Sequence, residues 1–344
     1  MKTYRAGISG AGFGVHSHLP ALIAHPRFEV VAIASPSSAA AVAAERKIPH
    51  AFTSAREMIA GCELDVVVVA SPPFAHRDDV LAALDAGKHV MCEKPFALNI
   101  EEAEEMVAAA RDAGTACALS HEFRFVPERA ALREMVENGH LSPLREIEIT
   151  QLAGWLRPAG ERPRGWWFER ERGGGIAGAL LSHIIDSANW TVGRAPRSAQ
   201  GLLRTANPKR RDARGEFASN VDDGAFALLD YGDGLVGRLS VDATVAVESF
   251  TIAAHAESRT AVASGANIVE MRLFSIEGDE TDELACKRSP YAKFESINGN
   301  VPLLMELYDE WIKQIETGSS AIPTFEEALA TQRVLAAIGY TTPS

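Results

Sequence analysis

A lysine at the end of a predicted strand is the first candidate for chemistry in this sequence. Lys94 lies in the segment Glu93-Lys94-Pro95, directly after the short apolar run at 90–92. Ligands in open α/β sheets bind beyond the carboxyl ends of the strands, and Pro95 restricts the backbone of the residue before it. An ammonium fixed there can hydrogen-bond a substrate hydroxyl and help carry its proton. The alternative is a surface salt bridge between Lys94 and Glu93.

A histidine in a predicted helix is the second candidate. Three glycines at 173–175 precede a segment, from Ile176 to about Trp190, that has the periodicity of a helix. His183, Asp186 and Trp190 share one face of that helix. An imidazole there can act as a general base on a hydroxyl whose carbon gives up hydride, and a structural histidine is the alternative. Asp186 is interpreted either as the group that orients His183 or as a carboxylate on the helix surface or at a domain contact.

A glycine turn near the start of the chain predicts a dinucleotide site. Residues 4–9 have the pattern of a strand, the turn 10–14 reads Gly-Ala-Gly-Phe-Gly, and a helical segment follows. The first glycine allows a tight turn, and the second lets backbone amides approach a pyrophosphate at the helix N-terminus. The third glycine of the G-x-G-x-x-G pattern is expected at Val15, so the one at 14 comes a place early. A plain turn is the alternative. The residues assigned to the cofactor are Gly10, Gly12, Phe13 and Gly14.

The end of the second predicted strand, 28–34, bears on the choice of dinucleotide. NAD-binding folds carry an acidic residue there that binds the ribose hydroxyls, whereas this chain has Ser35-Pro36-Ser37-Ser38. Serines at a helix start can hold a 2′-phosphate, and no carboxylate is present to repel it. The pattern therefore favours NADP over NAD, with Ser35 and Ser37 as contacts. The alternative is that Ser37 or Ser38 only caps the next helix.

Strands and helices alternate through the first half of the chain, which predicts a doubly wound parallel sheet. The continuous apolar run 64–70 is typical of a strand covered on both faces. In the second half, segment 144–151 alternates like a strand, and turn signals after Arg197 separate further strands. We expect an α/β protein with a Rossmann domain at 1–122 and an α+β domain at 123–344 that contains a large open, mostly antiparallel sheet.

Composition and charge narrow the range of partners. The chain has 344 residues, a net charge of −12 and no extended basic cluster, which argues against binding to nucleic acid or to an anionic membrane. No apolar run reaches the ~20 residues that span a bilayer, and no signal peptide is recognisable. The four cysteines are scattered and form no metal-binding pattern. We therefore expect reduced thiols, no metal site and a cytoplasmic location.

Aromatic and basic residues in the second half are candidates for substrate contacts. Arg124 binds either the substrate or a carboxylate in a structural ion pair. Trp166 and Trp167 can stack on the face of a sugar, or they can pack in the core or at an interface. Trp155 is expected to be buried for packing, and the basic run 209–211 is expected to be solvated.

These motifs together resemble the Gfo/Idh/MocA family of two-domain NAD(P)-dependent dehydrogenases, which act mostly on sugars and cyclic polyols. The resemblance covers nearly the whole chain. It rests on Gly10-x-Gly12, on the run Val-Val-Val-Val-Ala-Ser-Pro-Pro with His76, on Gly-Lys-His-Val-x-Cys-Glu-Lys-Pro, and on the glycine run at 173–175 with His183. The resemblance implies that Lys94 is the active-site lysine. It also implies that Glu93 helps to place the cofactor and that Lys94 and Pro95 belong to the cofactor site. By the same resemblance the nicotinamide side is lined by Ser71, Pro72 and His76.

Two positions depart from the family pattern. The aspartate that is usual four residues before the histidine is Ala179, and the glycine that is usual two residues before it is Leu181. The expected trio of lysine, aspartate and histidine is therefore incomplete. This departure bears on the polyol mechanism and leaves the prediction of cofactor binding unchanged.

We predict an NAD(P)-dependent oxidoreductase that acts on a CH–OH group of a sugar or sugar-like small molecule. Lys94 is expected to polarise the reacting oxygen and His183 to exchange the proton. The resemblance implies a homodimer or homotetramer formed through the C-terminal sheet. The alternatives are a regulatory protein that binds NAD(P) and a sugar without turnover, and a reductase of amines or imines on the same fold. The expected substrate contacts are Arg124, Trp166, Trp167, His183 and Asp186.

Overall fold

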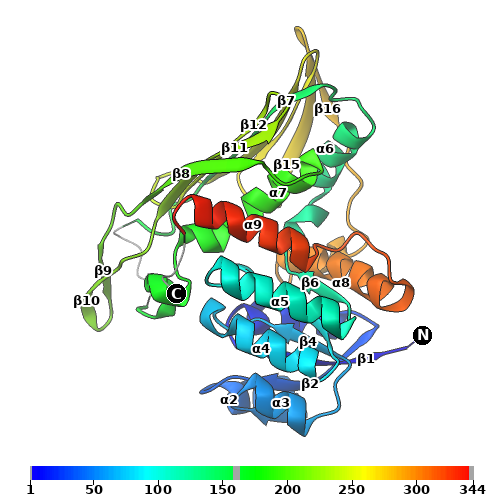
Figure 1. Cartoon of the computed structure of the whole chain (residues 1–344), viewed down its shortest axis with the longest axis vertical. Helices are drawn as coiled ribbons and strands as arrows, with labels where there is room; N and C mark the ends of the chain where they lie inside the picture. Colours follow the sequence, from blue (N-terminus) through cyan, green and yellow to red (C-terminus); the bar gives the residue numbers. More distant parts are fainter. Residues whose placement is uncertain (1, 158–162, 341–344) are drawn as a thin grey trace. The chain divides into compact units, whose positions relative to one another are not determined.

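The computed structural model describes residues 2–157 and 163–340 (Figure 1). These residues form two compact units. No helix in this described part of the chain combines the length and the apolar character needed to cross a membrane.

Each unit is built from two stretches of chain. The first unit contains the described residues up to Glu122 together with Ser289–Leu329. The second contains Phe123–Arg288 and the described residues from Ala330 onward. The predicted domain boundary at 122/123 assigned all later residues to the second domain. In the structure, Ser289–Leu329 packs with the first unit.

A parallel sheet forms the centre of the first unit. Six strands of the described chain pair in the order β3-β2-β1-β4-β5-β6, and each of these pairings is parallel. They are β1 (Tyr4–Ser9), β2 (Phe28–Ala34), β3 (His50–Phe52), β4 (Val66–Val69), β5 (His89–Cys92) and β6 (Cys117–Leu119). The strand order reverses between β1 and β4, which is where doubly wound sheets bind ligands. The predicted Rossmann sheet is confirmed.

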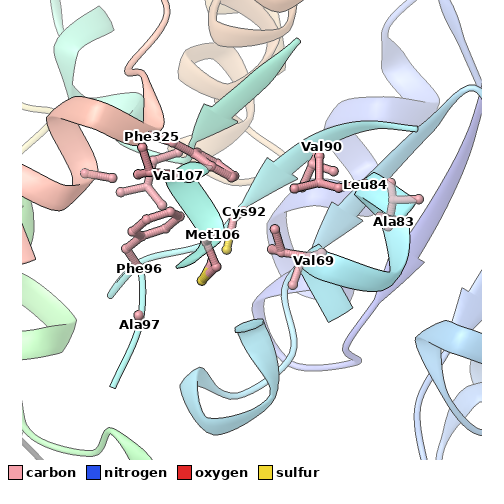
Figure 2. Close-up of a cluster of buried hydrophobic side chains, with 14 of the residues drawn as sticks. Val69, Ala83, Leu84, Val90, Cys92, Phe96, Ala97, Met106, Val107 and Phe325 are labelled. Atoms are coloured by element: carbon pink, nitrogen blue, oxygen red, sulfur yellow. The ribbon is translucent and has the colours of Figure 1, made fainter. Parts of the chain in front are cut away.

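All four valines of β4 are fully buried, which shows that both faces of the sheet are covered. The helices of the unit are α1 (Leu19–Ala24), α2 (Ala39–Arg46), α3 (Ala55–Gly61), α4 (Pro73–Asp85), α5 (Ile100–Ala113) and α8 (Asn300–Thr317), and α9 (Phe325–Ala337) starts here. Figure 2 shows part of one buried cluster, in which Phe325 packs on Phe96 with ring centroids 4.6 Å apart. On α8, Trp311 is fully buried and donates Nε1–H to the carbonyl of Ala116 at 3.0 Å. These contacts explain why the C-terminal stretch belongs to the first unit.

Reciprocal caps fix where two of these helices begin. At α5, Glu102 donates its N–H to Oδ1 of Asn99 at 2.8 Å, and the Glu102 carboxylate accepts from the N–H of Leu98 at 3.0 Å. At α9, Glu327 donates its N–H to Oγ1 of Thr324 at 3.2 Å and accepts from the Thr324 N–H at 2.8 Å. The second is a capping box, and the first differs from it in that the carboxylate accepts from the residue before the N-cap.

A mixed sheet forms the centre of the second unit. Eight strands of the described chain pair in the order β16-β15-β14-β13-β7-β12-β11-β8. They are β7 (Leu144–Leu152), β8 (Ser198–Arg204), β11 (Gly224–Gly232), β12 (Leu235–Asp242), β13 (Ser249–Ala256), β14 (Thr260–Gly265), β15 (Met271–Glu277) and β16 (Glu280–Leu284). β7 pairs parallel with β12, and the other pairings are antiparallel. The predicted large, mostly antiparallel sheet is confirmed.

One face of the mixed sheet carries helices α6 (Pro127–Glu137) and α7 (Ser182–Val192). α7 contacts β7 and β12, and α6 contacts β14 and β15. The buried residues of β7 include Ile147 and Ile149, which alternate with half-exposed glutamates as predicted. Apolar side chains of β8, β11 and β12 nevertheless stay exposed, and they are Leu202, Leu228 and Val236.

One expectation about the second unit is wrong, and another holds only in part. The basic run 209–211 lies in the strand β9 (Lys209–Asp212), which pairs with β10 (Gly215–Ala218), and its central Arg210 is buried, whereas Lys209 and Arg211 are exposed as expected. Arg210 reaches Asp223 at 3.1 Å, so an internal carboxylate rather than solvent takes its charge. Trp155 is 48% exposed and donates Nε1–H to Glu248 at 2.9 Å. Hydropathy alone did not separate this tryptophan from a core residue.

Candidate active site

The three glycines of the dinucleotide turn have three different environments. Gly10 has a φ of +106°, and a Cβ added to it would lie 2.1 Å from the carbonyl oxygen of Ala70. A Cβ on Gly14 would lie 3.0 Å from the Ile8 side chain, so this glycine lets the helix pack closely on β1. A Cβ on Gly12 would meet no protein atom within 4 Å. The fold therefore requires glycine at 10, leaves little room for a side chain at 14, and imposes no such need at 12.

A turn of π-helix begins at Gly14. The helix that follows the turn starts as a π-helical segment at Gly14–His18 and continues as α1. A π-turn accommodates one extra residue relative to an α-helix and is frequent at functional sites. Gly14 thus provides the close helix–strand contact that the usual motif assigns to its third glycine, although the spacing of the motif differs by one residue.

Glu93 is a buried carboxylate held by a histidine that sequence reasoning missed. Nε2 of His18 lies 2.8 Å from Oε1 of Glu93, and Nδ1 of His18 lies 2.7 Å from the hydroxyl of Tyr308 on α8. Burial acts to raise the pKa of Glu93, but the hydrogen bond from His18 and the charge of Lys94 outweigh it, so the pKa lies below its usual value. Glu93 is therefore a carboxylate at neutral pH.

Lys94 follows β5 as predicted and is half-buried. Its backbone N–H donates to Oε2 of Glu93 at 3.2 Å, and the peptide bond to Pro95 is cis. Its ammonium lies 5.7 Å from the ring centroid of Phe13, which is a cation–π contact with the glycine turn. The structure therefore brings together the two sequence motifs that were predicted to serve the cofactor and the reaction.

His76 contacts two backbone segments at this edge of the sheet. It is almost fully buried, with Nε2 at 2.8 Å from the carbonyl of Ser71 and Nδ1 at 3.0 Å from the carbonyl of Pro95. Burial lowers its pKa. The ring thus connects the segment after β4, including Pro72 at the start of α4, to the segment after β5. The resemblance placed His76 beside the nicotinamide, and in the structure it holds the backbone of residues expected there.

Asp79 is a second residue that the sequence did not single out. Its Oδ2 accepts hydrogen bonds from the hydroxyls of Ser9 at 2.7 Å and Ser71 at 2.8 Å. These serines follow or end β1 and β4, the two strands at the reversal of strand order. Neither residue type nor local spacing distinguishes Asp79 from the other acids of α4, so only the fold could reveal it.

The serine segment after β2 lies at the start of α2. The hydroxyls of Ser35 and Ser38 lie 2.8 Å apart, and Ser37 is exposed. Ser38 is at the N-cap position of α2, but its side chain makes no capping hydrogen bond. The first turn of α2 contains no acidic residue. The structure thus places Ser35, Ser37 and Ser38 together at a helix start without a neighbouring carboxylate in that turn.

In the second unit, His183 lies in α7 directly after another π-helical segment, Ala177–Leu181. The imidazole is 2% exposed, and its ring packs on that of Phe123 with centroids 4.3 Å apart. The His183 carbonyl accepts a hydrogen bond from the hydroxyl of Ser187 at 2.8 Å. Position 179 lies within the π-segment.

Arg124 and Asp186 meet as an ion pair. Nε of Arg124 lies 2.9 Å from one carboxylate oxygen of Asp186, and a terminal nitrogen lies 2.5 Å from the other. Both side chains are almost fully buried. Of the two roles considered for Arg124, the structure shows the ion pair. The same pair connects the start of the second unit to α7, which carries His183.

The glycine run before α7 is closely packed. Glycine is needed at 174 because a Cβ there would lie 2.4 Å from the carbonyl oxygen of Trp167. Trp166 and Trp167 are themselves half-buried, which places them neither in the core nor fully in solvent. Asp222 accepts the N–H of Ala177 at 2.6 Å, and burial raises its pKa to about 6. The described residues contain no group of three or more His, Cys, Asp or Glu side chains that could hold a metal ion.

Comparison with known families identifies the two halves of the chain. Residues 4–121 match the oxidoreductase family with an NAD-binding Rossmann fold, and residues 130–262 match the GFO/IDH/MocA C-terminal domain. The chain belongs to the Gfo/Idh/MocA family. The resemblance predicted from the motifs is therefore confirmed, and the glycine turn and Glu93-Lys94-Pro95 both lie within the NAD-binding part of the family.

Relatives in the Gfo/Idh/MocA family include named sugar enzymes. An uncharacterised oxidoreductase of Synechocystis sp. is 36% identical over 57% of this chain and 53% of its own. A 1,5-anhydro-D-fructose reductase of Ensifer adhaerens is 32% identical over 61% of this chain and 60% of its own. A levoglucosan dehydrogenase of Pseudarthrobacter phenanthrenivorans is 29% identical over 71% of this chain and 68% of its own. The chain thus matches less than two thirds of the length of the first two relatives.

Solved structures with this family fold have catalytic and regulatory names. A levoglucosan dehydrogenase in complex with NADH and L-sorbose has a TM-score of 0.87 and 23% identity, over 99% of this chain and 97% of its own. A super-repressor mutant of Gal80p from Saccharomyces cerevisiae has a TM-score of 0.81 and 18% identity, over 99% of this chain and 96% of its own. At these identities the likeness establishes the fold, which both kinds of protein share.

Proposed function

We propose that this chain is an NAD(P)-dependent oxidoreductase that acts on a CH–OH group of a sugar or sugar-like small molecule. The observation that carries the proposal is the position of Lys94. Its ammonium follows β5, next to the buried carboxylate of Glu93 and over the ring of Phe13 in the glycine turn. The names of the reductase and dehydrogenase relatives support the substrate class.

The glycine turn fits a dinucleotide. Open space lies beside Gly12, where even a methyl group would meet no protein atom within 4 Å. The helix that starts at Gly14 presents its N-terminus there, which favours a bound pyrophosphate. Gly10, Gly12 and Phe13 would hold that group. When bound, NAD(P) supplies the acceptor or donor of hydride. The nicotinamide half would lie toward the carboxyl ends of β4 and β5, near Ser71, Pro72 and Pro95.

The residues of the chain supply orientation and a path for the proton. Lys94 hydrogen-bonds the reacting oxygen and stabilises negative charge on it, as a fixed cation does. His183 accepts the hydroxyl proton when the substrate is oxidised and returns it in the reverse direction. Phe123 holds the imidazole ring by packing on it. Trp166 and Trp167 contribute an apolar surface for the sugar, as half-buried aromatic residues can.

A lysine variant tests this function. Lys94→Ala is expected to lower kcat about 10²–10⁴-fold, the usual contribution of a proton-transfer group. Cofactor binding, followed by quenching of tryptophan fluorescence, should change by less than about 3-fold. His183→Asn should also lower kcat and leave cofactor binding nearly unchanged. Lys88→Ala is the control, because it removes another lysine close to β5.

The same experiment distinguishes the enzyme from a regulator. The wild-type chain is incubated with NAD or NADP and a broad panel of sugars, and nicotinamide absorbance is followed. Turnover of any sugar that disappears in Lys94→Ala supports the proposal. Tight cofactor binding without turnover of any of these compounds would favour a regulatory role on the same fold. Ala179, in place of the usual aspartate, makes this comparison necessary.

We propose that the cofactor site accepts NADP as well as NAD. The serines at 35, 37 and 38 support a 2′-phosphate, and the first turn of α2 has no acid to repel it. Ser37→Asp should lower kcat/KM with NADP at least ~10-fold and with NAD less than ~3-fold, because the added carboxylate repels only the phosphate. Equal effects on both cofactors would rule out a role for this segment in their discrimination.

We also propose that the chain works as a homodimer or homotetramer in the cytoplasm. The exposed leucines and valine on the face of the mixed sheet support self-association, since apolar patches of this kind mark protein contacts. All four cysteines are thiols without a disulfide, which suits a reducing compartment.

A further inference from the structure

We propose that His18 and Tyr308 are positioning residues that hold the Glu93 carboxylate in one orientation and so keep Lys94 in place for the reaction. This inference rests on the proposed function for its catalytic consequence. Its structural part concerns only residues of the first unit and can be tested without a substrate. Neither residue belongs to a sequence motif that was assigned a role.

The three side chains are linked one after another by hydrogen bonds in the interior of the first unit. His18 lies between Glu93, at 2.8 Å, and Tyr308, at 2.7 Å, and all three are buried. His18 belongs to the helix that follows the glycine turn, and Tyr308 belongs to α8, 290 positions further along. The catalytic edge of the sheet is thus connected to a C-terminal helix by one imidazole.

Chemistry assigns the protons along this chain. The Glu93 carboxylate only accepts hydrogen bonds, so Nε2 of His18 is the donor. Burial raises the pKa of Tyr308 well above its usual value, so the phenol keeps its proton and donates it to Nδ1. Within the described residues, His18 is the hydrogen-bond partner found for the Tyr308 hydroxyl. An imidazole with its proton on Nε2 and an acceptor at Nδ1 satisfies both contacts.

The fixed carboxylate acts on Lys94 in two ways. Its second oxygen accepts the backbone N–H of Lys94 at 3.2 Å, which sets the direction of the chain at that residue. Its negative charge attracts the ammonium, and the same interaction lowers the pKa of Glu93.

Phe13 adds a third contact from the glycine turn. Its ring lies edge-on to His18, with centroids 5.6 Å apart, and 5.7 Å below the Lys94 ammonium. The carboxylate of Glu93 thus holds the backbone of Lys94, and the ring of Phe13 contacts its ammonium.

The test compares His18→Leu, which removes both hydrogen bonds, with His18→Gln, which keeps an N–H donor near the position of Nε2. Lys94 is labelled with acetic anhydride at pH 8, and the rate is measured by peptide mass spectrometry, because an amine that has lost its contacts is more accessible to the reagent. We expect labelling at least ~5-fold faster in His18→Leu than in the wild type and recovery toward the wild-type rate in His18→Gln. Lys88 serves as an internal reference in each sample.

Kinetics give the second readout. His18→Leu should lower kcat at least ~10-fold while the KM for cofactor changes less than ~3-fold, and His18→Gln should restore part of kcat. Tyr308→Phe should lower kcat by a smaller factor, because the imidazole loses only its second partner. Tyr291→Phe is the matched control. It removes a phenol that bonds Asp309 at 2.7 Å in the same unit, and it should leave both readouts within ~2-fold.

The outcomes separate this inference from the proposed function. Equal labelling of Lys94 in the wild type and both His18 variants, with all proteins folded by circular dichroism, overturns the inference. Equal loss of kcat in His18→Leu and His18→Gln also overturns it, since then the donor to Glu93 does not matter. Absence of turnover in the wild type contradicts only the proposed function, and the labelling rates still decide the placement of Lys94. Where His18→Leu does not fold, Tyr308→Phe is labelled instead, with ~2-fold faster reaction expected and an unchanged rate overturning the inference.

Discussion

Arg124 and Asp186 form a buried ion pair in which two guanidinium nitrogens each reach a different carboxylate oxygen, at 2.9 and 2.5 Å. The planar fork of arginine matches a carboxylate in this way and lysine does not. The pair holds the first residues of the second unit to the helix that carries His183. The roles of this pair and of three other features lead to specific expectations.

Removal of one partner of the ion pair should destabilise the protein strongly. Arg124→Ala leaves Asp186 buried without its guanidinium, and we expect a loss of about 3–5 kcal/mol in the free energy of unfolding. The double change Arg124→Leu with Asp186→Leu should cost less than Arg124→Ala alone, since no buried charge remains. Chemical denaturation of the three proteins measures this. Arg238→Ala is the control, because Arg238 is exposed and its pair with Glu148 is worth about 0–1 kcal/mol. A stable Arg124→Ala protein that no longer binds sugar would instead show a direct role in substrate recognition.

Two glycine variants in one turn should separate folding from cofactor binding. Gly10→Ala places a Cβ 2.1 Å from a carbonyl oxygen at a φ of +106°, so we expect more than about 2 kcal/mol of destabilisation. Gly12→Ala meets no protein atom within 4 Å and should change stability by less than about 0.5 kcal/mol. Its methyl group should nevertheless weaken cofactor binding at least ~10-fold, measured by fluorescence quenching. Wild-type affinity in Gly12→Ala would show that the dinucleotide binds elsewhere.

The buried carboxylate of Asp222 should make stability depend on pH. Burial raises its pKa from 3.8 to about 6, so its contribution to stability is complete below about pH 4 and is lost as the pH rises through about 6. At pH 7.5 the ionised group costs about 2–3 kcal/mol. Asp222→Asn keeps an oxygen that can accept the N–H of Ala177, and it should raise the unfolding midpoint at pH 7.5. The difference from the wild type should shrink toward pH 4.5, and a difference that is constant across this range contradicts the assignment.

A charge on the open face of the mixed sheet should prevent self-association. Leu228 is 60% exposed in the middle of β11, opposite Arg238 of β12. Leu228→Glu introduces a carboxylate that a paired sheet face would have to bury. For a chain of 36.9 kDa, light scattering of the wild type should give a dimer or a tetramer, and of the variant a smaller species. Val269→Glu, at an exposed residue between strands, is the control. A wild-type monomer at micromolar concentration would exclude this interface.

Local sequence patterns predicted the elements of the first unit well. β1 and β2 lie at 4–9 and 28–34 as expected, because strands buried on both faces need continuous apolar runs. The Glu93-Lys94-Pro95 segment was found for a similar reason, since a strand end followed by proline has a local signature. The doubly wound parallel sheet was also predicted, because the alternation of strands and helices leaves few possible topologies. The family was predicted from its motifs, whereas the order of the strands came from the structure.

The sequence by itself determined the sheet, the glycine turn and the place of Lys94, because each depends on neighbouring residues and on short, regular spacings. Only the tertiary structure decided that His18 and Tyr308 hold Glu93, that Asp79 connects two strand ends, and that Arg210 is neutralised inside the protein. These contacts join residues between 8 and 290 positions apart along the chain. A buried polar group finds its partner through the packing of whole elements, and no local pattern records which distant side chain that will be.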